Sequence, residues 1–238
     1  PFDKTAVDFL EGLNVPAYKL ASFEITDIPL IEYTASKGKP MIISTGIATF
    51  EDIQLAVETC RKAGNDDITI LKCTSSYPAP VDEANMVMMQ QFAKDFDVKV
   101  GLSDHTLGNT VPVVATVLGA KVIEKHFILD KSVGGPDASF SLDESEFKSM
   151  VEAVREAEKA MGKVDYTLTE KQEKGKDFSR TLYVVKDVKK GEILTKENVR
   201  SIRPGFGMHP KYLNEILGKE AKQDFLKGDR LNFKNVDL

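Results

Sequence analysis

Short apolar runs alternate with amphipathic stretches along the first 162 residues of the chain. The runs are rich in Val, Ile and Leu and are bounded by Gly, Pro or Asp, as buried β-strands usually are. Because no hairpin turn joins one run to the next, the pattern predicts a parallel sheet with right-handed crossovers. The predicted strands cover residues 17–21, 40–44, 68–74, 98–102 and 121–127.

Two of the stretches between these runs have apolar residues at helical spacing. Residues 49–63 predict one helix, which Thr49 can cap, although Asp52 suits a capping box less well than Glu would. Residues 143–161 predict a longer, charged helix. Its apolar face is expected to hold Phe147, Val151 and Val154.

Polar and reactive residue types directly follow several predicted strands. A doubly wound sheet and a (β/α)8 barrel both fit the alternation, but active sites of such barrels gather at the carboxyl ends of the strands. Polar groups after five strands in turn therefore favour an α/β fold of the (β/α)8 TIM-barrel type. These groups lie at residues 19–24, 44–46, 74–78, 103–105 and 124–126.

The rest of the chain differs from this alternating region. Residues 163–180 are polar without a sustained period, which predicts a linker after a barrel domain of residues 1–162. Residues 181–238 combine weak alternation with turn signals, which predicts a compact domain of short strands and turns. A short helical stretch is expected to begin at Leu194.

The composition narrows the choice of partners and compartment. The chain has 42% hydrophobic and 29% charged residues, a net charge of −5 and no basic block, so nucleic acid is not an expected partner. No apolar run is long enough for a membrane span, and no signal peptide pattern opens the sequence. Cys60 and Cys73 lack a CxxC spacing, so we expect two reduced, buried thiols in a cytoplasmic protein.

Two of the three histidines follow neighbouring predicted strands. Side chains alternate along a strand, so Ser103 shares a face with His105, and Glu124 shares one with His126. If these faces point inward, the two imidazoles meet at the barrel mouth and can bind a divalent metal ion, with open positions for water and substrate. Two hydrogen-bonded structural histidines remain the alternative.

Lys19 and several hydroxyl groups are candidates for binding an anion. A lysine inside an apolar strand needs an anionic partner, which can be a ligand phosphate or a carboxylate such as Glu24. Residues 44–46 (Ser-Thr-Gly) and 74–76 (Thr-Ser-Ser) place hydroxyls and amides in loops after strands, where anions bind readily. Each stretch alone is also a common turn, so only their combination points to a phosphate or carboxylate ligand.

Two glycine-containing loops carry further candidates. Two glycines and a proline precede Asp137 in a turn that could aim its carboxylate into the barrel mouth, although an ordinary Asx turn fits as well. Arg203 opens a second loop, Arg-Pro-Gly-Phe-Gly, which either lies on the surface or reaches a substrate.

Together these motifs resemble the sialic acid synthase family. The strings KLASFE, ISTG, KCTSSYP, GLSDHTL, EKHF, GPD and IRPGFG occur in family order over nearly the whole chain. The strings ASFE, GGPDASFS, TLYVVKD and RPGFGMHP are most similar to the pseudaminic acid synthase branch. The resemblance implies a TIM barrel followed by a small antifreeze-like (SAF, β-clip) domain. It also implies a domain-swapped homodimer in which the small domain of one chain caps the barrel of the other.

The resemblance also assigns roles to residues of this sequence. It implies that His105 and His126 bind Mn2+, or a similar ion such as Mg2+ or Co2+, and that they act with Lys19 and Glu24 in catalysis. The expected substrate-binding residues are Lys19, Ser22, Ser44, Ser75, Tyr77, Ser103, Asp137 and Arg203, the last of them from the partner chain.

The implied activity is that of a transferase that condenses phosphoenolpyruvate with an open-chain 2-acetamido sugar and releases phosphate. The expected sugar is 2,4-diacetamido-2,4,6-trideoxy-altrose, which gives pseudaminic acid. Synthesis of N-acetylneuraminate or legionaminate from an N-acetylmannosamine-type sugar is the alternative. A Schiff-base aldolase acting through Lys19 and a non-catalytic carbohydrate-binding protein remain as rivals.

The sequence departs from the family pattern at its start. Pro1 lies in what resembles the helix before the fourth barrel strand, and the 162 residues before the linker are fewer than the roughly 250 of a full barrel. The resemblance thus implies that the first three strand–helix units are missing, and with them a glutamate and a lysine of the family's site. We expect little or no turnover from this chain alone, and the general acid or base stays unassigned.

Overall fold

The computed structural model describes residues 1–237, which form two compact units, Pro1–Lys163 and the residues from Val164 onward. Each unit encloses its own hydrophobic core. Among the described residues, no helix combines the length and the apolar character needed to cross a bilayer.

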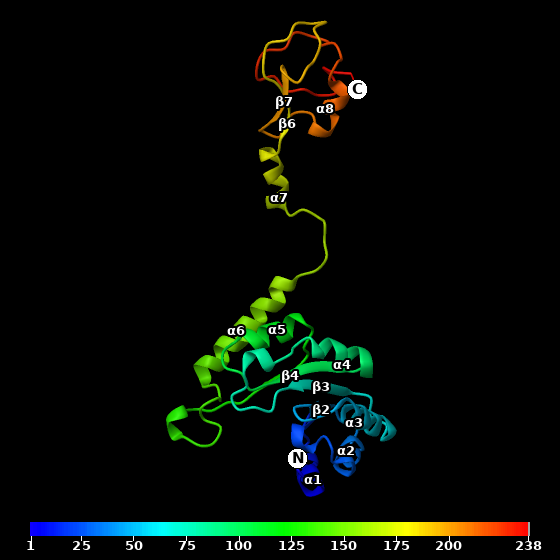
Figure 1. Cartoon of the computed structure of the whole chain (residues 1–238), viewed down its shortest axis with the longest axis vertical. Helices are drawn as coiled ribbons and strands as arrows, with labels where there is room; N and C mark the ends of the chain where they lie inside the picture. Colours follow the sequence, from blue (N-terminus) through cyan, green and yellow to red (C-terminus); the bar gives the residue numbers. More distant parts are fainter. Residues whose placement is uncertain (238) are drawn as a thin grey trace. The chain divides into compact units, whose positions relative to one another are not determined.

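A five-stranded parallel sheet forms the centre of the first unit (Figure 1). Its strands lie side by side in sequence order, and at least one helix connects each strand to the next. Each strand overlaps one of the apolar runs from which strands were predicted. The strands are β1 (Tyr18–Leu20), β2 (Met41–Ser44), β3 (Ile68–Cys73), β4 (Lys99–Asp104) and β5 (Ile123–Lys125).

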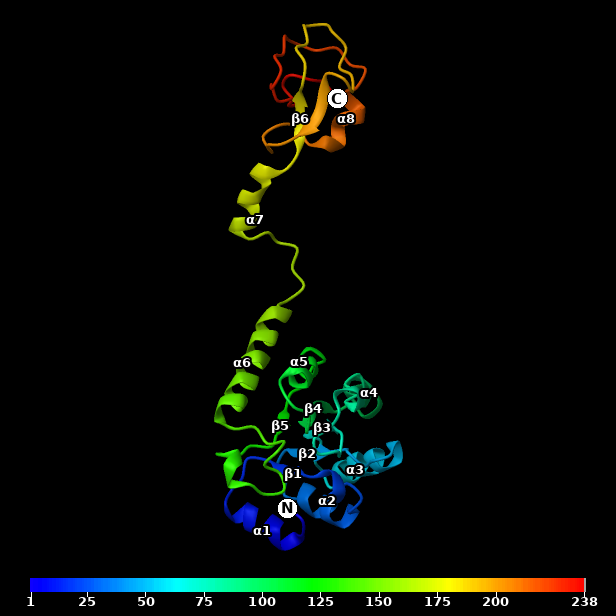
Figure 2. The same ribbon diagram turned by 60° about the vertical axis from the view of Figure 1, so that its left-hand side comes forward.

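Helices pack along the outer side of this sheet (Figure 2). Outward-facing strand side chains such as Leu20, Ile43 and Ile70 are fully buried against them, which places the main core between the sheet and the helices. The helices of this unit are α1 (Lys4–Gly12), α2 (Ile28–Ala35), α3 (Phe50–Lys62), α4 (Met88–Phe96), α5 (Thr110–Val117) and α6 (Glu144–Met161).

The sheet curls like the wall of a barrel. Lys19 Nζ of β1 lies 3.3 Å from Glu124 Oε2 of β5, although these are the two outermost strands. In a flat sheet the two strands would be about 19 Å apart, because neighbouring strands are spaced by about 4.8 Å. The curl and the unbroken strand order confirm the barrel-type α/β fold over the doubly wound alternative.

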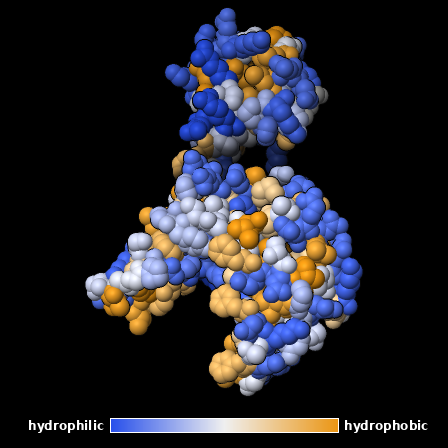
Figure 3. Space-filling view, turned by 60° about the horizontal axis from the view of Figure 1, so that its bottom comes forward, coloured by the Kyte–Doolittle hydropathy of each residue, from blue (hydrophilic) through white to orange (hydrophobic). Residues whose placement is uncertain are grey.

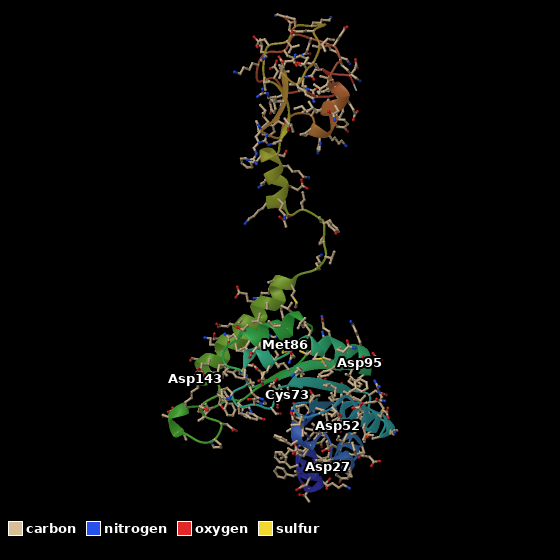
Figure 4. All side chains as sticks on the ribbon, viewed as in Figure 1. Asp27, Asp52, Cys73, Met86, Asp95 and Asp143 are labelled. Carbon is tan, nitrogen blue, oxygen red and sulfur yellow. The ribbon has the colours of Figure 1, made fainter. Side chains whose placement is uncertain are left out.

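The beginning of α3 shows that Asp52 completes a capping box with Thr49. Thr49 Oγ1 accepts a hydrogen bond from Asp52 N at 3.2 Å, and Asp52 Oδ2 accepts one from Thr49 N at 2.9 Å. Two otherwise unpaired donors of the first turn are thus satisfied reciprocally. The carboxylate of Asp52, labelled in Figure 4, also lies in the first turn, where the helix dipole favours negative charge.

The apolar face of α6 differs from the prediction at one position. Met150 is the buried residue of this helix, whereas Val151 is 39% exposed. The helix packs against α5. Met150 comes three residues after Phe147 and four before Val154, so helical spacing places these three residues on one face of α6. Val151 therefore lies at the exposed edge of this apolar face.

The second unit is built from short elements around a small core. Strands β6 (Thr181–Val184) and β7 (Val199–Ile202) pair antiparallel, and α8 (Leu213–Ile216) follows them. The core comprises Leu182, Val184, Val188, Leu194, Val199, Met208, Ile216, Ala221, Phe225, Leu231 and Val236.

One local prediction for this part of the chain was wrong. The short helical stretch from Leu194 is a turn, because the Asn198 side chain accepts from Thr195 N at 2.7 Å and donates to Ile193 O at 3.0 Å. Such side-chain bonds compete with helical backbone bonds. Within the polar segment 163–180, α7 (Glu170–Gly175) forms, since Thr169 and Gln172 make a capping box.

Candidate active site

A cavity of about 440 Å³ opens at the carboxyl ends of the parallel strands. In Figure 3 the first unit is visibly hollowed, with apolar and polar side chains at the rim. The cavity gathers residues from β1, β2, β4 and β5 and from the loops that follow β1, β3, β4 and β5, as expected of a barrel-type site. The residues predicted to form a site that line this cavity are Lys19, Ser22, Glu24, Ser44, Tyr77, Ser103, His105 and His126.

The two histidines meet because their strands end in register. Asp104, the last residue of β4, is paired with Lys125, the last residue of β5, so His105 and His126 follow at matching positions. The centroids of the two imidazole rings are 5.2 Å apart. This arrangement can place one nitrogen of each ring around a common ion.

One hydrogen bond fixes the orientation of His105. Its Nδ1 lies 2.9 Å from the Thr74 carbonyl oxygen, and because a carbonyl can only accept, Nδ1 carries the hydrogen. The Nε2 atom is therefore left to face the cavity as the potential ligand. Burial lowers the pKa of His105, but the neighbouring Cys73 thiol and the Thr74 carbonyl outweigh it, so the net direction is upward. A metal ion would compete with a proton at Nε2.

His126 has a different environment. Burial and the neighbouring His105 lower the pKa of His126, although Asp137 and Glu124 oppose this shift. A neutral ring at neutral pH keeps a lone pair for a metal ion. The Asp137 carboxylate, from the glycine-rich turn, lies 3.6 Å from His126 Nδ1, so it is next to the histidine pair although it does not line the cavity itself.

Aromatic rings close one side of the histidine pair. The Tyr77 ring centroid is 4.3 Å from that of His105 and 6.2 Å from that of His126. The Phe140 ring lies 5.0 Å from His126 and 5.3 Å from Tyr77. These contacts limit rotation of the imidazoles and exclude water from one side of them.

The donor set fits a metal ion that keeps open coordination positions. In the described part of the chain, no group of three or more His, Cys, Asp or Glu side chains is arranged to enclose an ion. Two imidazole nitrogens with Asp137 beside them supply half of a coordination shell, which leaves the remaining positions to water and substrate. Catalytic ions are bound in this open manner, whereas structural ions are enclosed by protein ligands.

Buried polar atoms that make no hydrogen bond gather at the same end of the sheet, although one of them, Glu124 Oε2, has Lys19 as an ion-pair partner. Within the described residues, the buried side-chain atoms that lack a hydrogen bond are Glu24 Oε2, Ser44 Oγ, Ser75 Oγ and Glu124 Oε2. Lys19 approaches Glu124 to 3.3 Å, but it directs a hydrogen bond to Leu20 O at 2.9 Å, so the ion pair is loose. Unsatisfied buried groups are rare in native proteins, and their concentration here indicates a polar ligand.

Gly46 allows three loops to converge beside this cavity. Its N–H donates to Ser22 Oγ at 2.9 Å, so one function of Ser22 is to hold the loop after β2. A Cβ atom at Gly46 would lie 2.0 Å from Ser75 Oγ and 2.8 Å from Ser22 Oγ. Ser75 itself does not line the 440 Å³ cavity but lies next to it through this contact.

Two residues in this region were not among the predicted site residues. Cys73 is buried with its Sγ 3.9 Å from His105 Nδ1, and it is labelled in Figure 4. Burial opposes ionisation of the thiol, but His105 and the hydroxyls of Ser22 and Ser103 together lower the pKa of Cys73. Glu124 lines the cavity two positions before His126. The strand alternation that placed Glu124 and His126 on one face was the available signal for Glu124.

The remaining candidate, Arg203, lies in the second unit. It directly follows β7 and is exposed. It belongs to a loop whose Gly205 N–H donates to Asp177 O at 2.8 Å, so the loop is anchored to its own unit.

A larger cavity, of about 640 Å³, lies at the opposite end of the sheet. Ile68, Lys99 and Lys121 from the amino ends of β3, β4 and β5 contribute to its wall. It contains no histidine and none of the buried unpaired atoms described above. In barrels this end serves stability rather than catalysis, so the smaller cavity is the candidate active site.

Comparison with known proteins agrees with this assignment. The NeuB family model matches residues 1–166, and the SAF domain model matches residues 179–236. The chain is 49% identical to a pseudaminic acid synthase of Helicobacter pylori, over 96% of this chain and 67% of that protein. It is 36% identical to an N,N'-diacetyllegionaminic acid synthase of Legionella pneumophila, over 99% of this chain and 68% of that protein.

Solved structures show the same architecture. The crystal structure of the spore coat polysaccharide biosynthesis protein SpsE from Bacillus subtilis matches with a TM-score of 0.65 and 32% sequence identity. The match covers 99% of this chain and 72% of that chain. A curled parallel sheet followed by a SAF domain, matched by both family models and by these relatives, shows that the chain belongs to the NeuB family.

Proposed function

We propose that this protein is a pseudaminic acid synthase, a transferase that condenses phosphoenolpyruvate with open-chain 2,4-diacetamido-2,4,6-trideoxy-altrose. The observation that carries the proposal is the convergence of His105, His126 and Lys19 with buried, unpaired polar atoms in one cavity. The identity to pseudaminic acid synthases supports the choice of sugar over those of more distant relatives.

The metal is proposed to be Mn2+, with Mg2+ or Co2+ as related ions, held by His105 and His126. When bound, such an ion supplies Lewis-acid polarisation to the aldehyde oxygen of the sugar. The Thr74 carbonyl and the Tyr77 ring keep the imidazoles oriented for this task. The surrounding carboxylates, Glu24 and Asp137 among them, favour a cation and are proposed to hydrogen-bond the sugar.

The anionic substrate is proposed to lie against β1 to β4. Lys19 would balance phosphate charge, since an ammonium group beside a developing phosphate stabilises it electrostatically. The expected further contacts are the hydroxyls of Ser22, Ser44, Ser75, Tyr77 and Ser103. In the condensation, C3 of phosphoenolpyruvate forms a bond to the aldehyde carbon, whose oxygen gains a proton. This step uses the C2–C3 double bond and leaves C2 electron-deficient, so water adds there and loses one proton, which balances the proton gained by the aldehyde oxygen. Cleavage of the bond between C2 and the phosphate oxygen then releases phosphate, which takes the proton of the remaining hydroxyl, and C2 becomes a ketone.

Product analysis tests this function. Because little turnover is expected from this chain alone, the assay uses a longer protein in which the first three strand–helix units precede this chain. That protein, Mn2+ and phosphoenolpyruvate would be incubated separately with the altrose derivative and with N-acetylmannosamine, and the products identified by mass spectrometry. We expect a nonulosonic acid and one equivalent of phosphate from the altrose derivative only. Product from N-acetylmannosamine alone would assign the N-acetylneuraminate reaction instead. Binding of the sugar and phosphoenolpyruvate without any product would contradict the condensation for this chain.

We also propose a homodimer in which the SAF domain of one copy, residues 181–238, follows the linker 163–180. This domain would bring Arg203 to the sugar that residues 1–162 of the other copy bind. The support is the family resemblance and the exposure of Arg203 in an anchored loop. If the site is shared, co-expressed His105→Ala and Arg203→Ala chains should regain about a quarter of wild-type turnover, because half of the dimers have one intact site. Two inactive variants that stay inactive together would rule out sharing.

A further inference from the structure

A buried ion pair lies on the outer face of the barrel wall, directly behind the two histidines. Lys125 Nζ is 2.6 Å from Asp104 Oδ2, and the two side chains are 0% and 1% exposed. The two residues are partners in the register of β4 and β5, and each immediately precedes one of the histidines. Asp104 and Lys125 contribute to the wall of the cavity, but their side chains are buried, and strand alternation directs them to the opposite face from the side chains of His105 and His126.

This pair holds the backbone on both sides of His105. Asp104 Oδ1 accepts hydrogen bonds from Thr106 N at 2.9 Å and from Thr106 Oγ1 at 2.8 Å. Lys125 Nζ also donates to the Thr106 carbonyl oxygen. The residues before and after His105 are therefore tied to the residue before His126, across two neighbouring strands.

Stability alone does not account for this arrangement. Removing two charges from water costs several kcal/mol per ion, and hydrophobic pairs of similar volume often stabilise a core equally well or better. Buried ion pairs can instead determine a specific geometry, because the charges must meet in one arrangement. We propose that Asp104 and Lys125 are positioning residues that fix the spacing of the His105 and His126 rings for metal binding, an inference that rests on the proposed metal site.

The test uses the double variant Asp104→Asn/Lys125→Met. It removes both charges while keeping side-chain volume and an amide oxygen for Thr106, so no unpaired charge is left in the core. We expect its Mn2+ dissociation constant, measured by titration with electron paramagnetic resonance, to rise about 10- to 100-fold, as for other residues that orient metal ligands. Its midpoint of urea unfolding should stay near that of the wild type, because both partners are replaced together.

Two control variants separate positioning from general stability. Lys99→Met breaks an exposed ion pair with Asp67, 2.8 Å long, at the amino end of the same strand, and should change neither measurement. Val57→Ala makes a cavity under α3 and should lower the unfolding midpoint without changing metal affinity. Unchanged Mn2+ affinity in a folded double variant would overturn the proposal.

A second readout does not require metal. The chain has three histidines, so the imidazole signals in a nuclear magnetic resonance spectrum of the metal-free protein can be assigned individually. We expect the His105 and His126 signals to move in the double variant, while His209 in the second unit stays unchanged. If the wild type does not bind Mn2+ but these two signals still move in the double variant, the proposed metal site is refuted. The proposal that Asp104 and Lys125 position the two histidine rings is then still supported. If the signals do not move, positioning is refuted.

Discussion

Replacing either His105 or His126 by alanine should abolish tight Mn2+ binding and, in the longer protein with all barrel strands, lower turnover by about a thousandfold or more. Each ring is proposed to supply one of two protein nitrogens, and the lost Lewis-acid polarisation is worth several kcal/mol of activation free energy. The ring centroids are 5.2 Å apart, so one ring cannot take over the coordination position of the other unless the ion moves. Titration with Mn2+ and steady-state kinetics measure the two effects.

The same variants should remain folded, which keeps the loss of metal binding interpretable. His105→Ala removes the bond to the Thr74 carbonyl and leaves a small cavity, so we expect about 1–3 kcal/mol of destabilisation. His209→Ala is the matched control, because His209 lies in the other unit, where its Nδ1 accepts a hydrogen bond from Lys211 N. Wild-type Mn2+ affinity in either His105→Ala or His126→Ala would contradict the assignment of that ring.

Gly101→Ala should destabilise the first unit at or above the upper end of the usual range of about 1–3 kcal/mol for overpacked cores. A Cβ atom at this position in β4 would lie 2.4 Å from the Val122 carbonyl oxygen and 2.6 Å from Leu71 Cδ2. The carbonyl is fixed, because it accepts a hydrogen bond of 2.9 Å from Leu102 N. Relief of the clash would therefore separate β4 from the segment that leads into β5. Urea unfolding of the variant measures this loss.

The control for Gly101→Ala is Gly12→Ala. Gly12 ends α1 and has no atom near the position that a Cβ would occupy, so alanine there should be neutral or stabilise the helix by up to about 1 kcal/mol. Equal unfolding midpoints for Gly101→Ala and the wild type would show that β4 and β5 tolerate a wider spacing. The account of the histidine pair would then lose its structural basis.

The sequence was sufficient to predict the features that depend on local periodicity. Short apolar runs bounded by Gly, Pro or Asp predicted the strands, and the alternation of side chains along a strand placed Ser103 and His105 on one face. It could not predict the 3.3 Å approach of Lys19 to Glu124, because this depends on the curl of the whole sheet. Nor could it predict the Asp104–Lys125 pair, since the burial of outward charges depends on the helices that cover them.

Two errors have the same physical origin. The turn after Leu194 was predicted to be helical because the segment has helix-forming residues, but Asn198 captures its backbone groups in a local hydrogen-bonded turn. Val151 was predicted to lie on the apolar face of α6, but Met150 is the buried residue of this helix, which packs against α5, and Val151 is 39% exposed. The composition of each segment is compatible with both the predicted and the observed arrangement, and side-chain contacts determine which of the two forms.

Pulsed electron paramagnetic resonance of the Mn2+-loaded protein, compared between natural-abundance and 15N-histidine samples, counts the imidazoles at the ion most directly. We predict couplings to two histidine nitrogens in the wild type. At Mn2+ concentrations high enough to load the weakened site of each variant, one coupling should be lost in His105→Ala and the other in His126→Ala. A bound ion that shows no histidine coupling, or that keeps both couplings in either variant, would contradict the metal site on which the proposed chemistry depends.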